Sequence, residues 1–195
     1  MPSYSMTRFP NNVQQQEPGA FAAARNLPRL PPRVDPAMPD AIRAGNKEWN
    51  SDYVNIKQDD GQYATIDLDK WDNSWTLRAH DFQFEIPSNA TITGIQVEFQ
   101  AHASLAGKII NQTLLLSPPG AVNKGNEDDF WPASDTTYIR GSGNDLWGAG
   151  AGAWTPAIIN SNGFSVYFEC ENYEYNGLVI GRVDYIKVTI YYSTP

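Results

Sequence analysis

The sequence predicts an all-β fold: a two-sheet antiparallel sandwich, with a jelly roll as the expected topology, preceded by an extended proline-rich N-terminal arm. Apolar and polar residues alternate with period two through much of 46–195. Turn signals such as Asp60-Gly61 and Asn162-Gly163 separate these stretches. No part of 46–195 has a convincing helical pattern. About eight or nine strands with one buried face each pack as a sandwich.

Residues 1–45 form the predicted arm. Eight of the 14 prolines lie at or before Pro39, and five arginines against three acidic residues give the segment a charge of +2. Proline fixes φ and favours an extended preceding residue, so we expect polyproline-like backbone over 28–39. Short helical turns fit 19–25 and 40–45. The composition also fits a disordered tail. We expect instead that the arm is ordered by lying on a neighbouring subunit or on another protein.

The arm contains the predicted partner-binding residues. Its apolar side chains would fill pockets on the partner, and its arginines would make bidentate contacts to carboxylates. These residues are Arg8, Phe9, Phe21, Arg25, Leu27, Arg29, Leu30, Arg33 and Met38.

The remaining chain, 46–195, is the predicted sandwich domain. Its 9 lysines and arginines against 19 acidic residues give it a charge of −10. The strands with the clearest alternation are 81–86, 95–103, 164–170 and 186–192. Shorter strand candidates are 53–56, 63–68, 109–116, 136–139 and 178–180. Periodicity predicts these strands but does not determine their order in the sheets.

The composition excludes several classes of protein. One Cys in 195 residues excludes an internal disulfide framework and a Cys-built zinc or iron–sulfur site. The net charge of −8 argues against a nucleic-acid partner, because phosphate contacts need a basic face. No apolar run approaches the roughly 18 residues of a membrane span, and the start lacks the pattern of a signal peptide. We therefore expect a soluble, non-secretory protein without a membrane partner.

The side chains that carry out most enzyme chemistry have simpler interpretations here. His80 and His102 fall on polar phases of their strands and are predicted to be solvated. Cys170 continues an apolar phase and is predicted to be a small core residue. Ser142 stands between two glycines without the strand and helix of a nucleophile elbow. We expect no catalytic site and no enzyme activity.

Two acidic loops and two glycosylation sequons are further candidate sites. Asp59-Asp60-Gly61 and Glu127-Asp128-Asp129 could supply oxygen ligands, but they lack the alternating spacing of a calcium loop. The sequons at Asn89 and Asn111 matter only in a eukaryotic secreted chain. We expect no metal and no cofactor.

The tryptophans allow three interpretations. All six, at positions 49, 71, 75, 131, 147 and 154, lie at strand boundaries or in loops. Trp131, Trp147 and Trp154 could anchor the long connection over 117–162 to the sheet, contact another subunit, or stack on sugars. We favour anchoring, because a connection of that length needs apolar side chains to stay folded.

One further pattern is an ordered series of short segments. Ile86-Pro87 ends a strand, Gly94 permits a close backbone approach, and Asp184-Tyr185 opens the last strand. The series consists of Asp60–Ala64, Leu77–Pro87, Ala90–Glu98, Gly143–Gly148, Trp154–Pro156, Asn162–Val166 and Val183–Tyr192. With these segments in this order, residues 49–193 resemble a recurring β-sandwich domain of tailed-bacteriophage virion proteins and related prophage proteins.

The resemblance implies a scaffold without catalytic residues. In that family such domains serve as virion surface or appendage modules. The expected function is a structural virion protein, a capsid decoration (cement) protein anchored by its arm to the major capsid protein or another virion protein. It would be made in the host cytoplasm, located in the virion, and form a dimer or trimer. The alternatives are a neck or tail-appendage adaptor and a carbohydrate-binding module for a host glycan.

Overall fold

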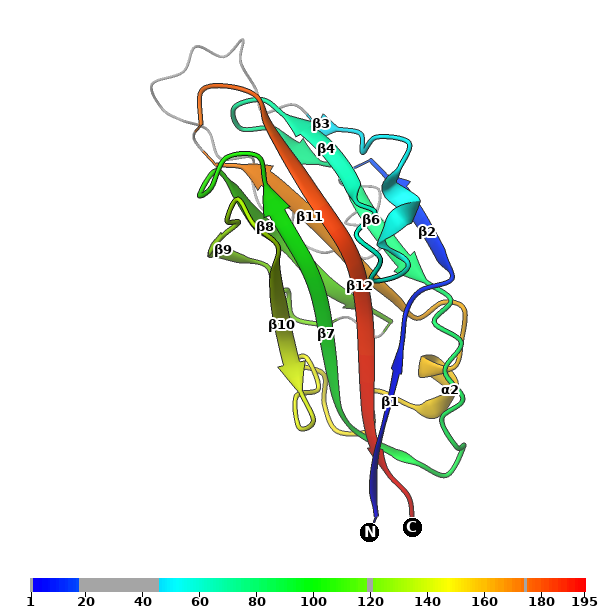
Figure 1. Cartoon of the computed structure of the whole chain (residues 1–195). Coiled ribbons are helices and arrows are strands. Elements are labelled where there is room, and N and C mark those ends of the chain that lie inside the picture. The colour runs from blue at the N-terminus through cyan, green and yellow to red at the C-terminus, as the bar shows by residue number, and fades with distance from the viewer. Residues whose placement is uncertain (1, 18–45, 119–120, 174) are drawn as a thin grey trace.

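The computed structural model describes residues 2–17, 46–118, 121–173 and 175–195, which fold into two stacked β-sheets (Figure 1). The first, sheet A, has the order β1-β12-β7-β10, and β4 also pairs with β12. Its strands are β1 (Ser3–Arg8), β4 (Ala64–Leu68), β7 (Thr91–Ala103), β10 (Thr136–Ser142) and β12 (Val179–Ser193). Along one edge of β12, β4 pairs with 179–183 and β1 pairs with 188–193.

Sheet B is built around β11, which pairs with β5, β6 and β8. Beyond β6 lies β2, beyond β8 lies β9, and the short β3 runs parallel to β5. The strands are β2 (Asn12–Gln16), β3 (Asn46–Lys47), β5 (Asn73–Ser74), β6 (Thr76–His80), β8 (Ile109–Ser117), β9 (Asn126–Phe130) and β11 (Ser165–Asn172).

The strand order confirms the predicted two-sheet sandwich and is that of a jelly roll. Eight strands lie in the two orders β4-β12-β7-β10 and β6-β11-β8-β9. From β4 onward through these eight strands, the chain crosses to the other sheet at every step except β8 to β9. This is the double Greek key of a jelly roll.

The core lies between the sheets because one side of each strand is apolar. Phe168 of β11 is at its centre, with ring centroids 5.2 Å from Phe99 of β7, 6.1 Å from Trp131 and 6.3 Å from Trp49. All four side chains are buried. The core therefore joins both sheets and two of the tryptophans predicted to lie outside the strands.

Two of the predicted strands are not strands. Residues 53–56 form a 3₁₀ helix, η1 (Tyr53–Ile56). Residues 81–86 have no regular structure, because Asp81 and Gln83 adopt positive φ angles of 59° and 52°, which a strand does not allow. The alternation over 81–86 still predicts burial correctly, since Phe82, Phe84 and Ile86 are in the core. The one short α-helix is α2 (Pro156–Ile159), capped by Thr155, among the residues described.

The predicted arm requires a correction over 2–17. This part of the chain supplies β1 at an edge of sheet A and β2 at an edge of sheet B. An edge strand needs few buried side chains, and here Met6 and Val13 pack against the core while polar neighbours face outward. Residues 18–45, which include Phe21, Arg25, Leu27, Arg29, Leu30, Arg33 and Met38, lie outside the described residues.

Candidate functional site

The chain ends that lead into and out of residues 18–45 are bound to each other. The Gln15 side chain accepts a hydrogen bond from the Trp49 backbone N–H at 2.9 Å and donates one to the Trp49 carbonyl at 3.4 Å. Gln15 Nε2 also donates to Glu48 Oε1 at 3.1 Å. We call Gln15 and Trp49 the neck. Because it joins β2 to the chain just after β3, the segment between them begins and ends at the same place on sheet B.

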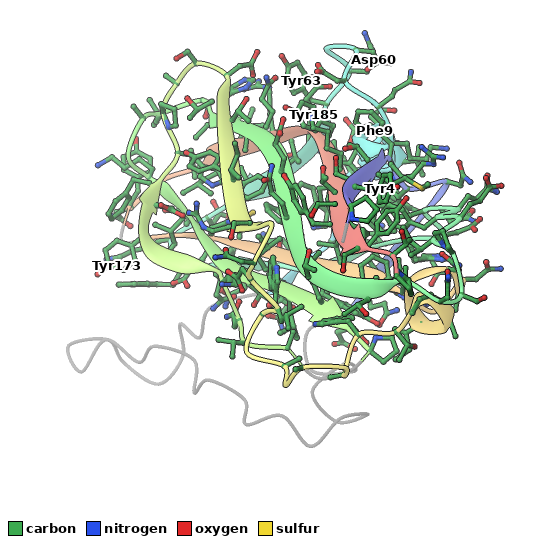
Figure 2. The ribbon with its side chains drawn as sticks, turned by 90° about the horizontal axis from the view of Figure 1, so that it is seen from below. Tyr4, Phe9, Asp60, Tyr63, Tyr173 and Tyr185 are labelled. Atoms are coloured by element: carbon green, nitrogen blue, oxygen red, sulfur yellow. The ribbon has the colours of Figure 1, made fainter. Side chains whose placement is uncertain are left out.

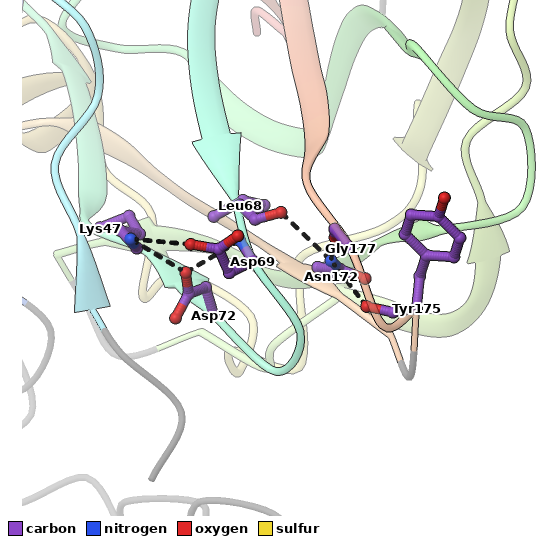
Figure 3. Close-up of polar contacts among 7 residues, drawn as sticks. All are labelled: Lys47, Leu68, Asp69, Asp72, Asn172, Tyr175 and Gly177. Atoms are coloured by element: carbon purple, nitrogen blue, oxygen red, sulfur yellow. Dashed lines mark hydrogen bonds and ion pairs between the residues drawn. The ribbon is translucent and has the colours of Figure 1, made fainter. Parts of the chain in front are cut away.

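An ion-pair cluster fixes β3 beside the neck (Figure 3). Lys47 Nζ lies 3.3 Å from Asp69 Oδ2 and 3.4 Å from Asp72 Oδ2, and Asp72 Oδ2 also accepts from the Asp69 backbone N–H at 2.9 Å. The negative charge of Asp72, and then the bond to Asp69, raise the pKa of Lys47. The Lys47 carbonyl accepts from the Trp75 backbone N–H at 2.6 Å.

Asn172, at the end of β11, holds the adjacent turn (Figure 3). Its side chain is buried, and its Nδ2 donates to the carbonyls of Leu68, Tyr175 and Gly177 at 3.2, 3.3 and 3.1 Å. These bonds tie the end of β4 to the β11–β12 connection. The contacts of Lys47 and Asn172 therefore hold β3, the end of β4 and the β11–β12 connection in place at this end of the sandwich.

Part of the outer side of sheet B is buried. Alternation along β11 puts Val166, Phe168 and Cys170 in the core and turns Tyr167 and Glu169 outward. We call this outward surface face B. Its described members include Thr76, Arg78, Ile110, Thr113, Leu115, Tyr167, Glu169 and Glu171, and Arg78 of β6 lies opposite Tyr167. Ile110, Leu115 and Tyr167 are 1%, 6% and 7% exposed, yet they are not members of the core cluster between the sheets.

Face B carries two carboxylates in addition to Arg78. Glu169 accepts hydrogen bonds from the hydroxyls of Thr76 and Thr113, the latter at 2.7 Å. Gln112 Nε2 donates to Glu171 Oε2 at 3.3 Å, and Glu171 is 6% exposed. The described donors to these two carboxylates are hydroxyl and amide groups.

The outer side of sheet A, face A, has a different construction. Its described members are Gln96, Glu98, His102, Tyr185, Lys187, Thr189 and Tyr191. Glu98 Oε1 accepts from Tyr185 Oη at 2.7 Å and pairs with Lys187 Nζ at 2.7 Å. Burial, together with the bond to Glu98, raises the pKa of Tyr185 to about 12. Figure 2 shows Tyr185 with Phe9 beside it; their rings meet edge to face at 6.0 Å.

A second polar group on face A contains one of the predicted histidines. Asp135 accepts from Tyr63 Oη at 2.8 Å and lies 2.6 Å from His102 Nδ1. The bond to Asp135 raises the pKa of Tyr63 to about 12, so this phenol is a poor acid or nucleophile at neutral pH. His102, predicted to be solvated, is instead half-buried, with the Tyr63 ring edge-on at 5.0 Å. The bonds of Asp135 to Tyr63 and His102 join three segments of the chain, which is a structural role.

The structure separates the predicted partner-binding residues. Arg8 is in β1 and Phe9 follows it against Tyr185, so both belong to the sandwich. Trp131, Trp147 and Trp154 are 0%, 0% and 2% exposed. Trp147 Nε1 donates to the Ile95 carbonyl at 2.9 Å, and Trp154 Nε1 donates to the Leu146 carbonyl at 2.9 Å. These tryptophans therefore anchor the connection, and their faces are not presented to a subunit or a sugar.

The other candidate side chains have structural surroundings. Cys170 is in the core, where burial raises its thiol pKa. His80 is half-buried rather than solvated, and burial lowers its pKa. Ser142 Oγ bonds to Asn144 Oδ1 at 2.7 Å. Asn111 is 0% exposed, so its sequon does not reach the surface.

The described parts of the two acidic loops make structural contacts, and the side chains of Glu127 and Asp128 lie outside the described residues. Asp184, in the bulge of β12, accepts from the Gly61 backbone N–H at 3.1 Å and so holds the 59–61 turn. Asp129 pairs with Arg140. No group of three His, Cys, Asp or Glu side chains suited to a metal ion occurs among the described residues. Likewise, no helix within them has the length and apolar character to cross a membrane.

Comparisons with family models, with curated proteins and with solved structures found no match to this chain. The candidate site therefore consists of the neck and face B. Sequence reasoning missed the neck, because a Gln-to-backbone contact across 34 residues leaves no local pattern. It had the signal for face B, since the alternation over 164–170 already put Tyr167 and Glu169 on the outward side.

Proposed function

We propose that the protein is a structural, non-enzymatic virion protein of a tailed bacteriophage, a capsid decoration (cement) protein that binds the major capsid protein through residues 18–45. The observation that carries this proposal is the neck. Hydrogen bonds between Gln15 and Trp49 hold the two flanks of residues 18–45 together on sheet B. We therefore treat this 28-residue segment, which contains four arginines, as a single attachment element. The resemblance over 49–193 supplies the virion context.

The closed neck suits attachment on physical grounds. A segment fixed at both ends has fewer conformations to lose on binding than a free terminal arm of equal length. Residues 18–45 have four arginines against two aspartates, so they would favour an acidic capsid exterior. Repetition of the contact over a symmetric lattice would add avidity.

A neck or tail-appendage adaptor remains the second candidate, because the same attachment element could bind a portal or tail ring. Copy number separates the two: a decoration protein is present in proportion to capsid subunits, and an adaptor in one ring. The carbohydrate-binding alternative has lost its main support, since Trp131 and Trp147 are buried.

Binding to capsids that lack the protein tests the proposal. Replacing 18–45 by a short Gly-Ser linker should abolish co-sedimentation while leaving the far-UV circular dichroism of the sandwich. Changing Arg25, Arg29 and Arg33 together to Gln should weaken binding at least tenfold. Arg8→Ala is the matched control, because Arg8 lies in β1, and it should bind normally. Full capsid binding by the linker variant would contradict the proposal.

A further inference from the structure

The end of the core nearest Asn172 contains buried polar atoms that do not pair with any protein group in the described structure. Asn111 of β8 is 0% exposed, and neither its Oδ1 nor its Nδ2 has a hydrogen-bond partner. Trp131 Nε1 and Asn172 Oδ1 are likewise buried and unpartnered. By contrast, Asn172 Nδ2 donates to the three carbonyls near it in Figure 3. Burying a polar atom without a partner is costly, so these four atoms call for one.

The strand register puts two of these side chains on the same side of sheet B. Asn111 lies directly opposite Cys170, and Ile109 lies directly opposite Asn172. Residues that lie opposite each other on antiparallel strands share a face, and both Cys170 and Ile109 belong to the core. Asn111 and Asn172 are therefore diagonal neighbours on the core side of the sheet, at a separation of roughly 7–8 Å.

Trp131, the residue after β9, reaches the same end of the core. Its backbone N–H donates to the Ile109 carbonyl at 2.8 Å, and its ring centroid lies 6.1 Å from that of Phe168. The ring also packs beside the Ile109 side chain on Gly181 of β12, where an added Cβ would meet Ile109 Cδ1 at 3.0 Å and Trp131 Cζ3 at 3.2 Å. Ile109 therefore adjoins Trp131, and through the strand register it also adjoins Asn111 and Asn172.

The backbone is irregular on both sides of Asn111. The pairing of β8 with β9 shifts register between Ile110 and Asn111, and the pairing of β11 with β8 shifts between Glu169 and Cys170. Such irregularities re-aim side chains next to sites that need them. Asn111 is the amide in a strand whose other core-facing residues include Ile109 and Leu114, so the irregular backbone presents a polar side chain where an apolar one is ordinary.

The mixture of donors and acceptors restricts what can satisfy these atoms. Asn111 Nδ2 and Trp131 Nε1 donate, whereas Asn111 Oδ1 and Asn172 Oδ1 accept. A cation would be repelled by the N–H groups, and an anion by the amide oxygens. Cys170 offers only a thiol, which is a weak donor and a weak acceptor. A water molecule both donates and accepts, and buried waters typically make about three hydrogen bonds to polar groups of this kind.

We infer that Asn111, Trp131 and Asn172 bind an internal water molecule at this end of the core. The water joins β8, the residue after β9 and the end of β11 through side chains that otherwise have only apolar neighbours or a thiol on the core side. The inference concerns the interior of the sandwich and holds or fails independently of the proposed virion role.

Water–protein NOE spectroscopy on the isotope-labelled full chain tests this inference directly. The indole N–H of Trp131 should show a cross-peak to a long-lived water, and a Trp131→Phe variant identifies its signal. The indole N–H groups of Trp147 and Trp154 are the internal controls. They donate to the carbonyls of Ile95 and Leu146 and should show no such cross-peak. A Trp131 indole without a water cross-peak would overturn the inference.

Two substitutions at Asn111 test whether this side chain holds the water. Asn111→Leu replaces the amide by apolar atoms of similar size, so the Trp131 cross-peak should disappear. Asn111→Ser keeps a hydroxyl and leaves room for the water, so the cross-peak should remain. The backbone amide spectrum shows whether each variant keeps the fold. A cross-peak that persists in a folded Asn111→Leu protein would refute the inference.

A crystal structure of the parent protein gives an independent measurement that does not depend on any variant folding. Density for a water should lie within about 2.7–3.2 Å of Trp131 Nε1 and of a side-chain atom of Asn111 or Asn172. A direct hydrogen bond from Asn111 Nδ2 to Asn172 Oδ1, with no water on Trp131, would contradict the inference.

Discussion

Face A and face B come from the same β-strand alternation and differ in how their polar groups are paired, although each has a buried tyrosine, Tyr185 at 3% and Tyr167 at 7% exposure. On face A, Glu98, Tyr185 and Lys187 satisfy one another, and Lys187 and Tyr191 remain half-buried. On face B, Tyr167 and Leu115 are buried although they point away from the core. The described polar groups of face A therefore pair with one another, and face B has the larger apolar share, in Ile110, Leu115 and Tyr167.

The difference shows that period-two alternation predicts which side of a strand a residue lies on, but not how exposed that side is. Period two assigns side chains to the two sides of a strand, and the apolar side of each strand here does form the core. It does not say whether the second side meets solvent. The presence of Tyr167 between Ser165 and Glu169 is the local sign that the outward side of β11 is more apolar than a solvated face requires.

The largest expected effect comes from residues 2–17, which contribute an edge strand to each sheet. Deleting them should remove about 5 kcal/mol or more, the lower end of the stability of a whole domain, and lower the melting midpoint by roughly 10–20 °C. Replacing 18–45 by a linker should leave cooperative unfolding. Circular dichroism melts of both variants check this. If the two variants melted alike, β1 and β2 would not be integral strands of the two sheets.

These two strands were hard to predict from the sequence. The high proline count and positive charge of 1–45 are properties of the whole segment and do not reveal two short strands in its first 17 residues. Asn12–Gln16 contains one apolar residue, Val13, and an edge strand needs no more. By contrast, β7, β11 and β12 were predictable because each buries a full row of side chains. Their long alternation leaves a clear pattern.

The next effect compares one tyrosine from each face. Tyr167→Ala should cost about 3 kcal/mol, because the ring is nearly as buried as a core aromatic residue. Tyr191→Ala should cost less than about 1 kcal/mol, since its ring is half-buried and its hydroxyl bonds to Gln96 at the surface. Urea unfolding measures both. Equal costs would mean that the two faces are equivalent after all.

A smaller effect concerns His80 at the end of β6. Burial, and then the charge of Arg78, lower its pKa from 6.5 in the folded protein. A base with a depressed folded pKa stabilises the fold above its unfolded pKa, and this stability is lost as pH falls through the folded value. His80→Gln should therefore flatten the decline in stability below pH 6.5. His102→Gln is the comparison from face A. An unchanged slope for His80→Gln would show that His80 titrates as in the unfolded chain.

The candidate site was less predictable than the fold, for a physical reason. Gln15 is one of three consecutive glutamines, and nothing local distinguishes it from Gln14 and Gln16. Its role depends on Trp49, 34 residues away, whose backbone it binds only after both sheets have formed. The anchoring role of Trp147 was predictable because a large apolar side chain in a glycine-rich connection needs a buried position.

The smallest expected effect compares one buried carboxylate from each side of the sandwich. Burial raises the pKa of Asp184, so its ionised form is penalised in the folded state. An acid with a raised folded pKa contributes stability that is full below its unfolded pKa and is lost as pH rises through the folded value. Asp184→Asn removes that loss and keeps an oxygen acceptor for the Gly61 N–H. It should slightly stabilise the protein at pH 7. Glu171→Gln should do the opposite, because its carboxylate accepts a hydrogen bond from Gln112 Nε2 and a charged acceptor makes a stronger bond than an amide oxygen. Urea unfolding at pH 7 and pH 3.5 gives both signs. If both substitutions stabilised the protein at pH 7, the carboxylate of Glu171 would be a cost to the fold, as that of Asp184 is.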